Sequence, residues 1–155
     1  MTDEIVLRPA TPADADAMAE VQNAIHAAGL RATPSSPALI LERYINASGR
    51  IACTVAQRGG QVLGFQSLKR AGPDNPYGVT SGWGIIGTHI RPDAGRSGIG
   101  RRLFAQSLHY ARDAGLRHID ATIADDNGAA LAYYQAMGFT PYRKTDGASP
   151  HRFDL

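Results

Sequence analysis

The sequence feature that most restricts how this chain can fold is a glycine-rich turn between two regular patterns. Residues 85–90 are apolar and rich in β-branched side chains, which predicts a strand. From Leu103 to Ala111, apolar residues recur every three to four positions, which predicts an amphipathic helix. Gly95, Gly98 and Gly100 lie in the connection. We therefore expect the chain to leave a strand, turn through glycine and enter a helix.

This turn has the chemistry of an anion-binding site. The first amide N–H groups of a helix have no acceptor within the helix, and they lie at the positive end of its dipole. Because glycine has no Cβ, an anion can approach the main chain closely at these positions. The positive side chains nearby are Arg91, Arg96, Arg101 and Arg102. We interpret the predicted anion as a pyrophosphate.

Two common glycine-rich motifs do not fit the turn. A Walker loop ends in Gly-Lys-Ser or Gly-Lys-Thr, whereas Gly100 is followed by Arg101 and Arg102. A dinucleotide-binding fingerprint needs another glycine where this chain has Leu103, and it lies near the first strand of its domain. Taken alone, the turn is equally compatible with a simple helix start.

A second block of residues makes the pattern more specific. Asn127, Ala130, Tyr134, Gly138 and Phe139 follow a predicted strand at residues 119–124. Together with Gly95-x-x-Gly98-x-Gly100, this block resembles the GNAT superfamily of acyl-CoA-dependent N-acetyltransferases. The family patterns are Arg/Gln-x-x-Gly-x-Gly/Ala and then Asn-x-x-Ala, Tyr and Gly-Phe. The resemblance covers the second half of the chain closely and the first half loosely.

The resemblance implies that the chain binds acetyl-CoA as its acyl donor. In this family the main-chain amides of the turn bind the pyrophosphate, and the pantetheine arm lies between two separating strands, where a backbone N–H binds the oxyanion. The residues that the resemblance places beside the cofactor are Thr88, His89, Ile90, Gly95, Arg96, Ser97, Gly98, Ile99, Gly100, Arg101, Asn127 and Tyr134. The family's Arg/Gln position is Gly95 here, with Arg96 one place later. We therefore expect a weaker or shifted side-chain contact to the phosphates.

Tyr134 is the predicted general acid. It occupies the tyrosine position of the family's second block, where a phenol can protonate the departing thiolate. The alternative is that Tyr133 and Tyr134 both only pack against the sheet. For Asn127 we predict two compatible roles, as the cap of the last helix and as a hydrogen-bond partner of the CoA arm.

The sequence gives a weaker indication of which residue is the general base. The resemblance implies a glutamate or histidine on the strand before the turn, and His89 is the one group there that titrates near neutrality. Strand alternation places His89 on the face opposite Thr88 unless a bulge reverses the parity, so a structural histidine is the alternative. Glu42 or Asp120 acting through a water is a further option. We expect surface or packing positions for His26, His109 and His118.

Composition narrows the function classes. The chain has 155 residues, 43% hydrophobic and 19% charged, which predicts a single domain spanning residues 1–155. No apolar run approaches the roughly 20 residues that cross a bilayer, and the acidic N-terminus does not resemble a signal peptide. We therefore expect a cytoplasmic protein without a membrane partner. A net charge of +2 is too small to predict nucleic acid as a main partner. Cys53 is expected to be a buried, inert thiol, and no metal site is expected.

The expected elements follow from caps, glycines and apolar periods. They are a strand at 5–7, a helix from Thr11 to Gly29, a helix from Ser36 to about Gly49, strands at 51–57 and 61–69, the central strand, turn and helix, a strand at 119–124, a helix ending at Gly138, and strands at 139–144 and 151–155. Segment 71–82 is either a loose tip or a loop over the substrate site. This order fits an α+β fold, a GNAT-like mixed, mostly antiparallel sheet flanked by about four helices.

Together these observations predict an N-acetyltransferase. It would move an acetyl group from acetyl-CoA to a primary amine of a small molecule by direct attack, without a covalent enzyme intermediate. A homodimer is compatible with the sequence. The alternatives are a non-catalytic acyl-CoA-binding or sensing module, an acetyltransferase for protein amino groups and, more distantly, a nucleic-acid-binding protein.

Overall fold

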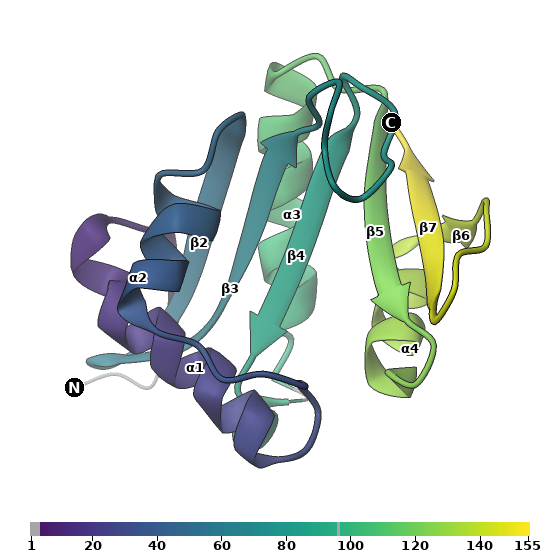
Figure 1. Ribbon diagram of the computed structural model, residues 1–155. Coiled ribbons are helices and arrows are strands. Elements are labelled where there is room, and N and C mark those ends of the chain that lie inside the picture. Colours follow the sequence, from purple (N-terminus) through teal and green to yellow (C-terminus); the bar gives the residue numbers. More distant parts are fainter. Residues whose placement is uncertain (1–3, 96) are drawn as a thin grey trace.

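The computed structural model describes residues 4–95 and 97–155, and within them seven strands form one sheet (Figure 1). The strands lie in the order β1 (Ile5–Pro9), β2 (Arg50–Arg58), β3 (Gln61–Arg70), β4 (Gly84–Ile90), β5 (His118–Ala124), β7 (Ala148–Asp154) and β6 (Thr140–Pro141). Neighbouring strands are antiparallel except β4 and β5, which are parallel. The predicted fold class is confirmed.

The first helix begins and ends where its caps predict. A short 3₁₀ turn, η1 (Pro12–Asp14), leads into α1 (Ala15–Ala27). Asp14 Oδ2 accepts a hydrogen bond from the Thr11 N–H at 2.8 Å, which completes the capping box. Gly29 follows the helix with φ +79°, a left-handed conformation that glycine adopts without strain.

The second helix differs from its prediction. Its cap is as expected, since Ser36 Oγ accepts from the Leu39 N–H, but α2 (Pro37–Ile40) is only four residues long. It continues as a π-helical turn, η2 (Leu41–Ile45), closed by a 2.7 Å bond from the Asn46 N–H to the Leu41 carbonyl. The wider turn brings Tyr44 onto the sheet, with its ring 5.2 Å from that of Phe65. Apolar spacing alone does not distinguish an α-turn from a π-turn, and π-turns often occur at functional sites.

Helices cover both faces of the sheet. In Figure 1, α1 and α2 lie in front of β2–β4, and α3 (Ile99–Asp113) lies behind them. The front core contains Met18, Ile40 and Phe65, all fully buried. Behind the sheet, α3 and α4 (Gly128–Met137) pack over a cluster that includes Phe104, Ile119 and Phe139. Each such side chain removed from water contributes about 1.5–3 kcal/mol to folding.

The sheet opens between its two parallel strands. Only Gly84 and Ile85 of β4 pair with β5, opposite Ile119 and Asp120. Beyond these pairs the strands diverge toward the lower end of the sheet in Figure 1. This opening lies next to the turn that leads into α3.

The last strands also differ from prediction. The strand expected at 139–144 is only the two-residue β6, because Pro141 has no N–H to continue the ladder. β7 begins at Ala148, three residues earlier than expected, and Pro150 lies within it opposite Thr122. Among the described residues, no helix has both the length and the apolar character needed to cross a membrane.

Candidate active site

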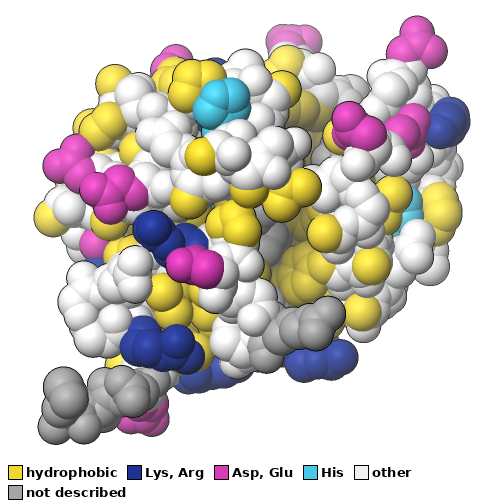
Figure 2. Space-filling view, turned by 90° about the horizontal axis from the view of Figure 1, so that it is seen from below, with side chains coloured by type: hydrophobic (Ala, Val, Ile, Leu, Met, Phe, Trp, Pro, Cys, Tyr) yellow, Lys and Arg dark blue, Asp and Glu magenta, His cyan; other side chains and the backbone are white. Residues whose placement is uncertain are grey.

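A cavity of about 210 Å³ occupies the opening between β4 and β5. Its walls come from β4 (Ile86 to His89), β5 (Thr122 to Ala124), the start of α4 and the segment that follows α1. Seen from the end where the strands separate, the surface is hollowed between the two halves of the molecule (Figure 2). The cavity therefore lies between α1 on the front face of the sheet and α4 on the back face.

The main chain of β4 presents polar groups to this cavity. The Arg91 N–H donates to the Leu63 carbonyl, and the Trp83 carbonyl accepts from the Ala71 N–H, so both bond to the β3 side. Because strand hydrogen bonds alternate in direction, the groups of Thr88 point toward β5 instead. The ladder with β5 ends before this residue. The Thr88 N–H thus faces the opening with no partner on β5, beside the Tyr134 hydroxyl.

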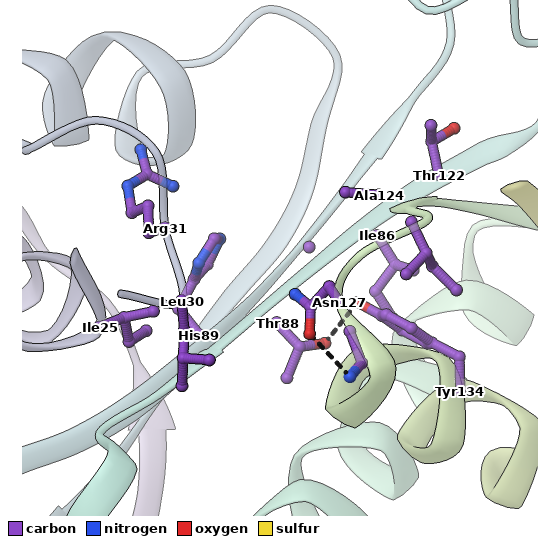
Figure 3. A pocket seen from close by; sticks show the side chains of 13 residues that line it. Ile25, Leu30, Arg31, Ile86, Thr88, His89, Thr122, Ala124, Asn127 and Tyr134 are labelled. Atoms are coloured by element: carbon purple, nitrogen blue, oxygen red, sulfur yellow. Dashed lines mark hydrogen bonds between the residues drawn. The ribbon is translucent and has the colours of Figure 1, made fainter. Parts of the chain in front are cut away.

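Tyr134 reaches the same opening from α4. Its hydroxyl donates to Thr88 Oγ1 at 2.8 Å (Figure 3). Burial raises the pKa of Tyr134 above its usual value, although the hydrogen bond to Thr88 acts in the opposite direction. The phenol therefore keeps its proton at neutral pH and can act as a donor.

A buried hydrogen-bond network fixes Thr88 and Tyr134. Gln66 Nε2 donates to Thr88 Oγ1 at 2.9 Å and to Tyr133 Oη at 3.0 Å, while its Oε1 accepts from Ser107 Oγ at 2.6 Å. Thr88 Oγ1 accepts from both Tyr134 and Gln66, so its own O–H is left to donate, and the Tyr133 hydroxyl is within its reach. Sequence analysis missed Gln66. The available signal was a glutamine directly after the apolar run from Val62 to Phe65.

The glycines of the turn serve different purposes. Gly98 has φ +78°, and a Cβ added there would meet nothing within 4 Å, so its main chain is open to a ligand. A Cβ on Gly100 would lie 2.6 Å from Tyr133 Cε1, so this glycine is required by the packing of α4 on α3. A cavity of about 350 Å³ lies over the turn, between Gly95, Gly98 and α4. A cavity therefore lies where the sequence predicts an anion-binding site.

The other predicted residues of the turn can be placed in part. Ile90, Ser97, Ile99 and Arg101 line the cavity over the turn. Ser97 Oγ donates to the Ala94 carbonyl at 2.6 Å, so this side chain closes the turn itself. The predicted contact of Arg96 lies outside the described residues.

His89 lies on the face opposite Thr88, as strand alternation predicts. Its ring packs 4.8 Å from that of Phe65, its Nδ1 lies 3.5 Å from Gln22 Nε2, and its Nε2 lies 3.3 Å from Tyr44 Oη. Burial, with a smaller effect from the positive charge of Arg31, lowers the pKa of His89 to about 3. The imidazole lines the cavity but is a weak base there.

Asn127 has the predicted capping contact. Its Oδ1 accepts from the Ala130 N–H at 3.0 Å, and Figure 3 shows its amide nitrogen turned away from the helix. Among the described residues, none accepts a hydrogen bond from that nitrogen, and Asn127 lines the cavity. The side chain can therefore cap α4 and contact a ligand at the same time.

A second, larger cavity of about 570 Å³ lies beside the first on the front face, and the two share Arg31, Gly87, His89 and Thr122. The segment 71–82 lies against it and contributes Tyr77.

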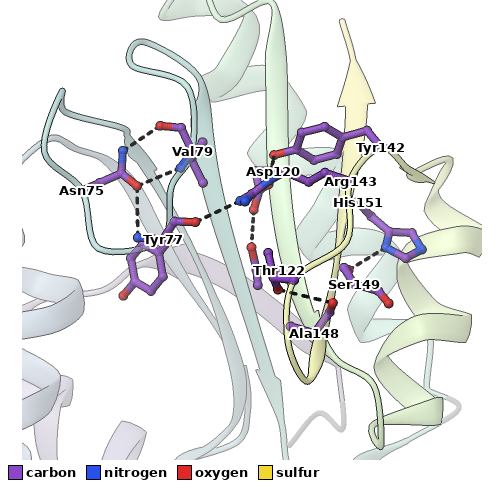
Figure 4. A network of polar contacts seen from close by, with 11 residues as sticks. Asn75, Tyr77, Val79, Asp120, Thr122, Tyr142, Arg143, Ala148, Ser149 and His151 are labelled. Atoms are coloured by element: carbon purple, nitrogen blue, oxygen red, sulfur yellow. Dashed lines mark hydrogen bonds and ion pairs between the residues drawn. The ribbon is translucent and has the colours of Figure 1, made fainter.

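Segment 71–82 is an ordered loop held by Asn75 and Arg143 (Figure 4). Asn75 bonds Val79 through both main-chain groups, at 3.0 and 2.7 Å. Arg143 donates to the Tyr77 carbonyl at 2.9 Å. Of the two alternatives for this segment, the structure therefore favours a loop beside the site.

The remaining candidates lie outside the opening. Cys53 is buried, and burial raises its pKa to about 12, so the thiol is protonated at neutral pH, as predicted. Asp120 is fully buried, and its oxygens accept from Thr122 and Tyr142. Neither Glu42 nor Asp120 lines either cavity. Within residues 4–95 and 97–155, no group of three or more His, Cys, Asp or Glu side chains is placed to hold a metal ion.

A mixed sheet that opens beside a glycine-rich turn at the start of a helix is the arrangement expected of an acyl-CoA-dependent transferase domain. The model of the acetyltransferase (GNAT) family matches residues 18–139. The chain therefore belongs to the GNAT family, and the family predicted from the two sequence blocks is confirmed. An N-acetyltransferase from Thermoplasma acidophilum, paia, solved in complex with coenzyme A, has a similar fold, with a TM-score of 0.77 at 14% identity over 98% of this chain and 99% of that one.

Curated relatives have more than one acceptor. The aminoglycoside N(6')-acetyltransferase type 1 of Stenotrophomonas maltophilia is 29% identical over 86% of this chain and 84% of its own length. The mycothiol acetyltransferase of Thermomonospora curvata is 35% identical over 57% of this chain. The chain spans only 27% of the length of that mycothiol acetyltransferase.

Proposed function

We propose that this protein transfers an acetyl group from acetyl-CoA to a primary amine of a small molecule. One observation carries the proposal. The protonated hydroxyl of Tyr134 and the main chain of Thr88, which has no partner on β5, meet in an opening that begins beside the glycine-rich turn. Membership of the acetyltransferase (GNAT) family and the likeness to a fold that binds coenzyme A support it.

The chain's own residues have three roles in the reaction. The amides at the start of α3 bind the pyrophosphate of the donor, and the Thr88 N–H donates to the carbonyl oxygen as it becomes an oxyanion. The neutral amine attacks the thioester carbon, a C–N bond forms and the C–S bond breaks. Tyr134 donates a proton to the departing thiolate, and the proton lost by the amine restores the phenol through solvent.

Direct attack is proposed because Cys53 is buried and protonated, which disfavours a covalent acyl-enzyme intermediate. His89 was the predicted base, but a pKa of about 3 makes it a poor one. We therefore propose that the amine enters the opening already neutral, and that the imidazole mainly forms part of the wall.

Calorimetry with coenzyme A, followed by thiol release from acetyl-CoA with a panel of amines, tests the proposal. We expect heat of binding and amine-dependent release of free thiol. Heat without thiol release would instead support an acyl-CoA-binding or sensing module. Absence of heat would overturn both readings, because both require the turn to bind the donor.

A further inference from the structure

The second cavity, on the front face, has a concentration of positively charged side chains in its wall. Arg31 follows α1, Arg43 lies in η2 and Lys69 lies on β3, so three separate elements bring cations to one hollow of about 570 Å³. Among the described residues that line it, none is an aspartate or glutamate. Glu42 and Asp74, which lie near these cations in the sequence, are not part of its wall.

These cations lack compensating charge in the part of the chain that the structure describes. Within residues 4–95 and 97–155, none of the three forms an ion pair. Arg31 Nε donates to the Thr33 carbonyl at 3.0 Å, and Lys69 Nζ lies 5.4 Å from the centre of the Tyr77 ring. Neither contact neutralises a charge. Like charges that converge on one hollow raise its affinity for an anion.

The positive charge of these side chains shifts the pKa values of neighbouring groups. Arg31 and Arg43 both oppose the rise that burial causes in the pKa of Tyr44, and Arg31 helps to lower the pKa of His89. The positive potential therefore extends from the rim of the cavity to the wall that it shares with the opening between β4 and β5.

Tyr44 adds a hydrogen-bond donor. Gln22 Nε2 can only donate, and it contacts Tyr44 Oη at 3.0 Å and His89 Nδ1 at 3.5 Å. The His89 proton then lies on Nε2, which donates to Tyr44 Oη at 3.3 Å. Since Tyr44 Oη accepts both bonds, its own proton is free for the cavity that it lines.

We propose that the acceptor is an amine that also carries an anionic group, either carboxylate, phosphonate or phosphate, bound by Arg31, Arg43 and Lys69. This inference rests on the proposed acetyl transfer. Gly87 and Thr122 line both cavities, so the proposal places the anionic group on one side of this shared wall and the reacting nitrogen on the other, at the thioester. Gly87 has no side chain, so the acceptor can span from the cations to the opening.

Matched acceptor pairs test the inference through thiol release from acetyl-CoA. The pairs are β-alanine with β-alaninamide and aminoethylphosphonate with ethanolamine, and spermidine serves as a polycation. We expect kcat/KM to be about tenfold or more higher for the anionic member of each pair, with spermidine the poorest acceptor, because charge-assisted bonds form only with the anion. Equal values within both pairs, or a preference for spermidine, would overturn the inference and leave acetyl transfer intact.

Variants identify the cations. Arg43→Gln and Lys69→Gln should each raise KM for the anionic acceptor about tenfold and leave the neutral acceptor nearly unchanged. Arg112→Gln, an exposed arginine on α3, is the matched control and should behave as wild type. An unchanged preference in both cavity variants would exclude these side chains.

A binding experiment separates the two proposals. Calorimetry with β-alanine and β-alaninamide, on protein saturated with coenzyme A, needs no turnover. If no amine releases thiol, yet β-alanine binds and Arg43→Gln weakens that binding about tenfold, the anion site stands and acetyl transfer fails. Equal binding of the two compounds would overturn the anion site whatever the activity.

Discussion

Two adjacent tyrosines on α4 have different surroundings. The Tyr134 hydroxyl donates to Thr88 Oγ1 in the opening between β4 and β5. The Tyr133 hydroxyl donates to the Gly100 carbonyl at 2.8 Å, and its ring lies against that glycine. The first hydroxyl is therefore available to a reaction in the opening, and the second holds α4 onto α3.

We expect Tyr134→Phe to lower kcat by roughly 10²–10⁴-fold, because it removes the proton donor for the thiolate, with a smaller effect on the affinity for coenzyme A. Steady-state thiol release measures the first effect and calorimetry the second. Tyr133→Phe is the control. It should cost about 1 kcal/mol of unfolding free energy and change kcat only a few-fold. A Tyr134→Phe enzyme that turns over at the wild-type rate would remove this hydroxyl from the mechanism.

The weak basicity of His89 has a kinetic consequence. With a pKa of about 3, the imidazole is neutral throughout the pH range in which an amine titrates. We expect the acidic limb of kcat/KM to follow the ammonium pKa of the acceptor, so that two acceptors differing by about two pKa units give limbs that differ by the same amount. His89→Gln should keep both limbs. One limb common to both acceptors, and lost in His89→Gln, would identify His89 as the base after all.

At the scale of elements, α4 lies between the opening and the glycine-rich turn before α3. Its first residues line the cavity between β4 and β5, and Tyr133 and Met137 line the cavity over the turn. Asn127 caps the start of the helix through its Oδ1, while its amide nitrogen has no hydrogen-bond acceptor among the described residues.

Asn127→Asp keeps an oxygen for the Ala130 N–H and removes the amide donor. If the donor binds the CoA arm, affinity for coenzyme A should fall about tenfold in calorimetry, while the thermal midpoint stays close to wild type. Asn127→Ala is the comparison variant and should also lose about 1 kcal/mol of stability with the cap. Wild-type affinity in Asn127→Asp would restrict this residue to capping.

Sequence patterns predicted the elements better than the contacts between them. Caps at Thr11, Ser36 and Asn127 are local, so they were found directly. The π-turn was not, because its period leaves no distinct apolar spacing. The contact between Gln66 and Thr88 depends on the register of β3 with β4, which alternation alone does not define. The cations of the front cavity are far apart in the sequence and meet only in the folded chain.

For the whole molecule, His89 couples stability to pH. Its pKa is about 3 in the folded protein, against 6.5 for an unperturbed histidine. Above pH 6.5 this group contributes fully to stability, and the contribution is lost as the pH falls toward 3, because the unfolded chain then binds a proton that the folded chain excludes. Between pH 7 and pH 5 the loss should be about 2 kcal/mol.

Urea unfolding at the two pH values, compared with His89→Gln, isolates this contribution. Carboxylates and the other histidines titrate in both proteins, so their effects cancel in the difference. The variant should be about 2 kcal/mol less sensitive to the change. Identical pH dependence in the two proteins would mean that His89 is protonated as readily in the folded state as in the unfolded one.

Because β4 and β5 pair over only a short stretch, the sheet is incomplete between them. Two residue pairs join β4 to β5, and past them each strand exposes an edge to the same gap. An extended ligand that hydrogen-bonds to the edge of β4 would take the place of a neighbouring strand there. The protein would then recognise this ligand through the same kind of main-chain hydrogen bonds that join its own strands. The sheet would be more continuous with the ligand bound than without it.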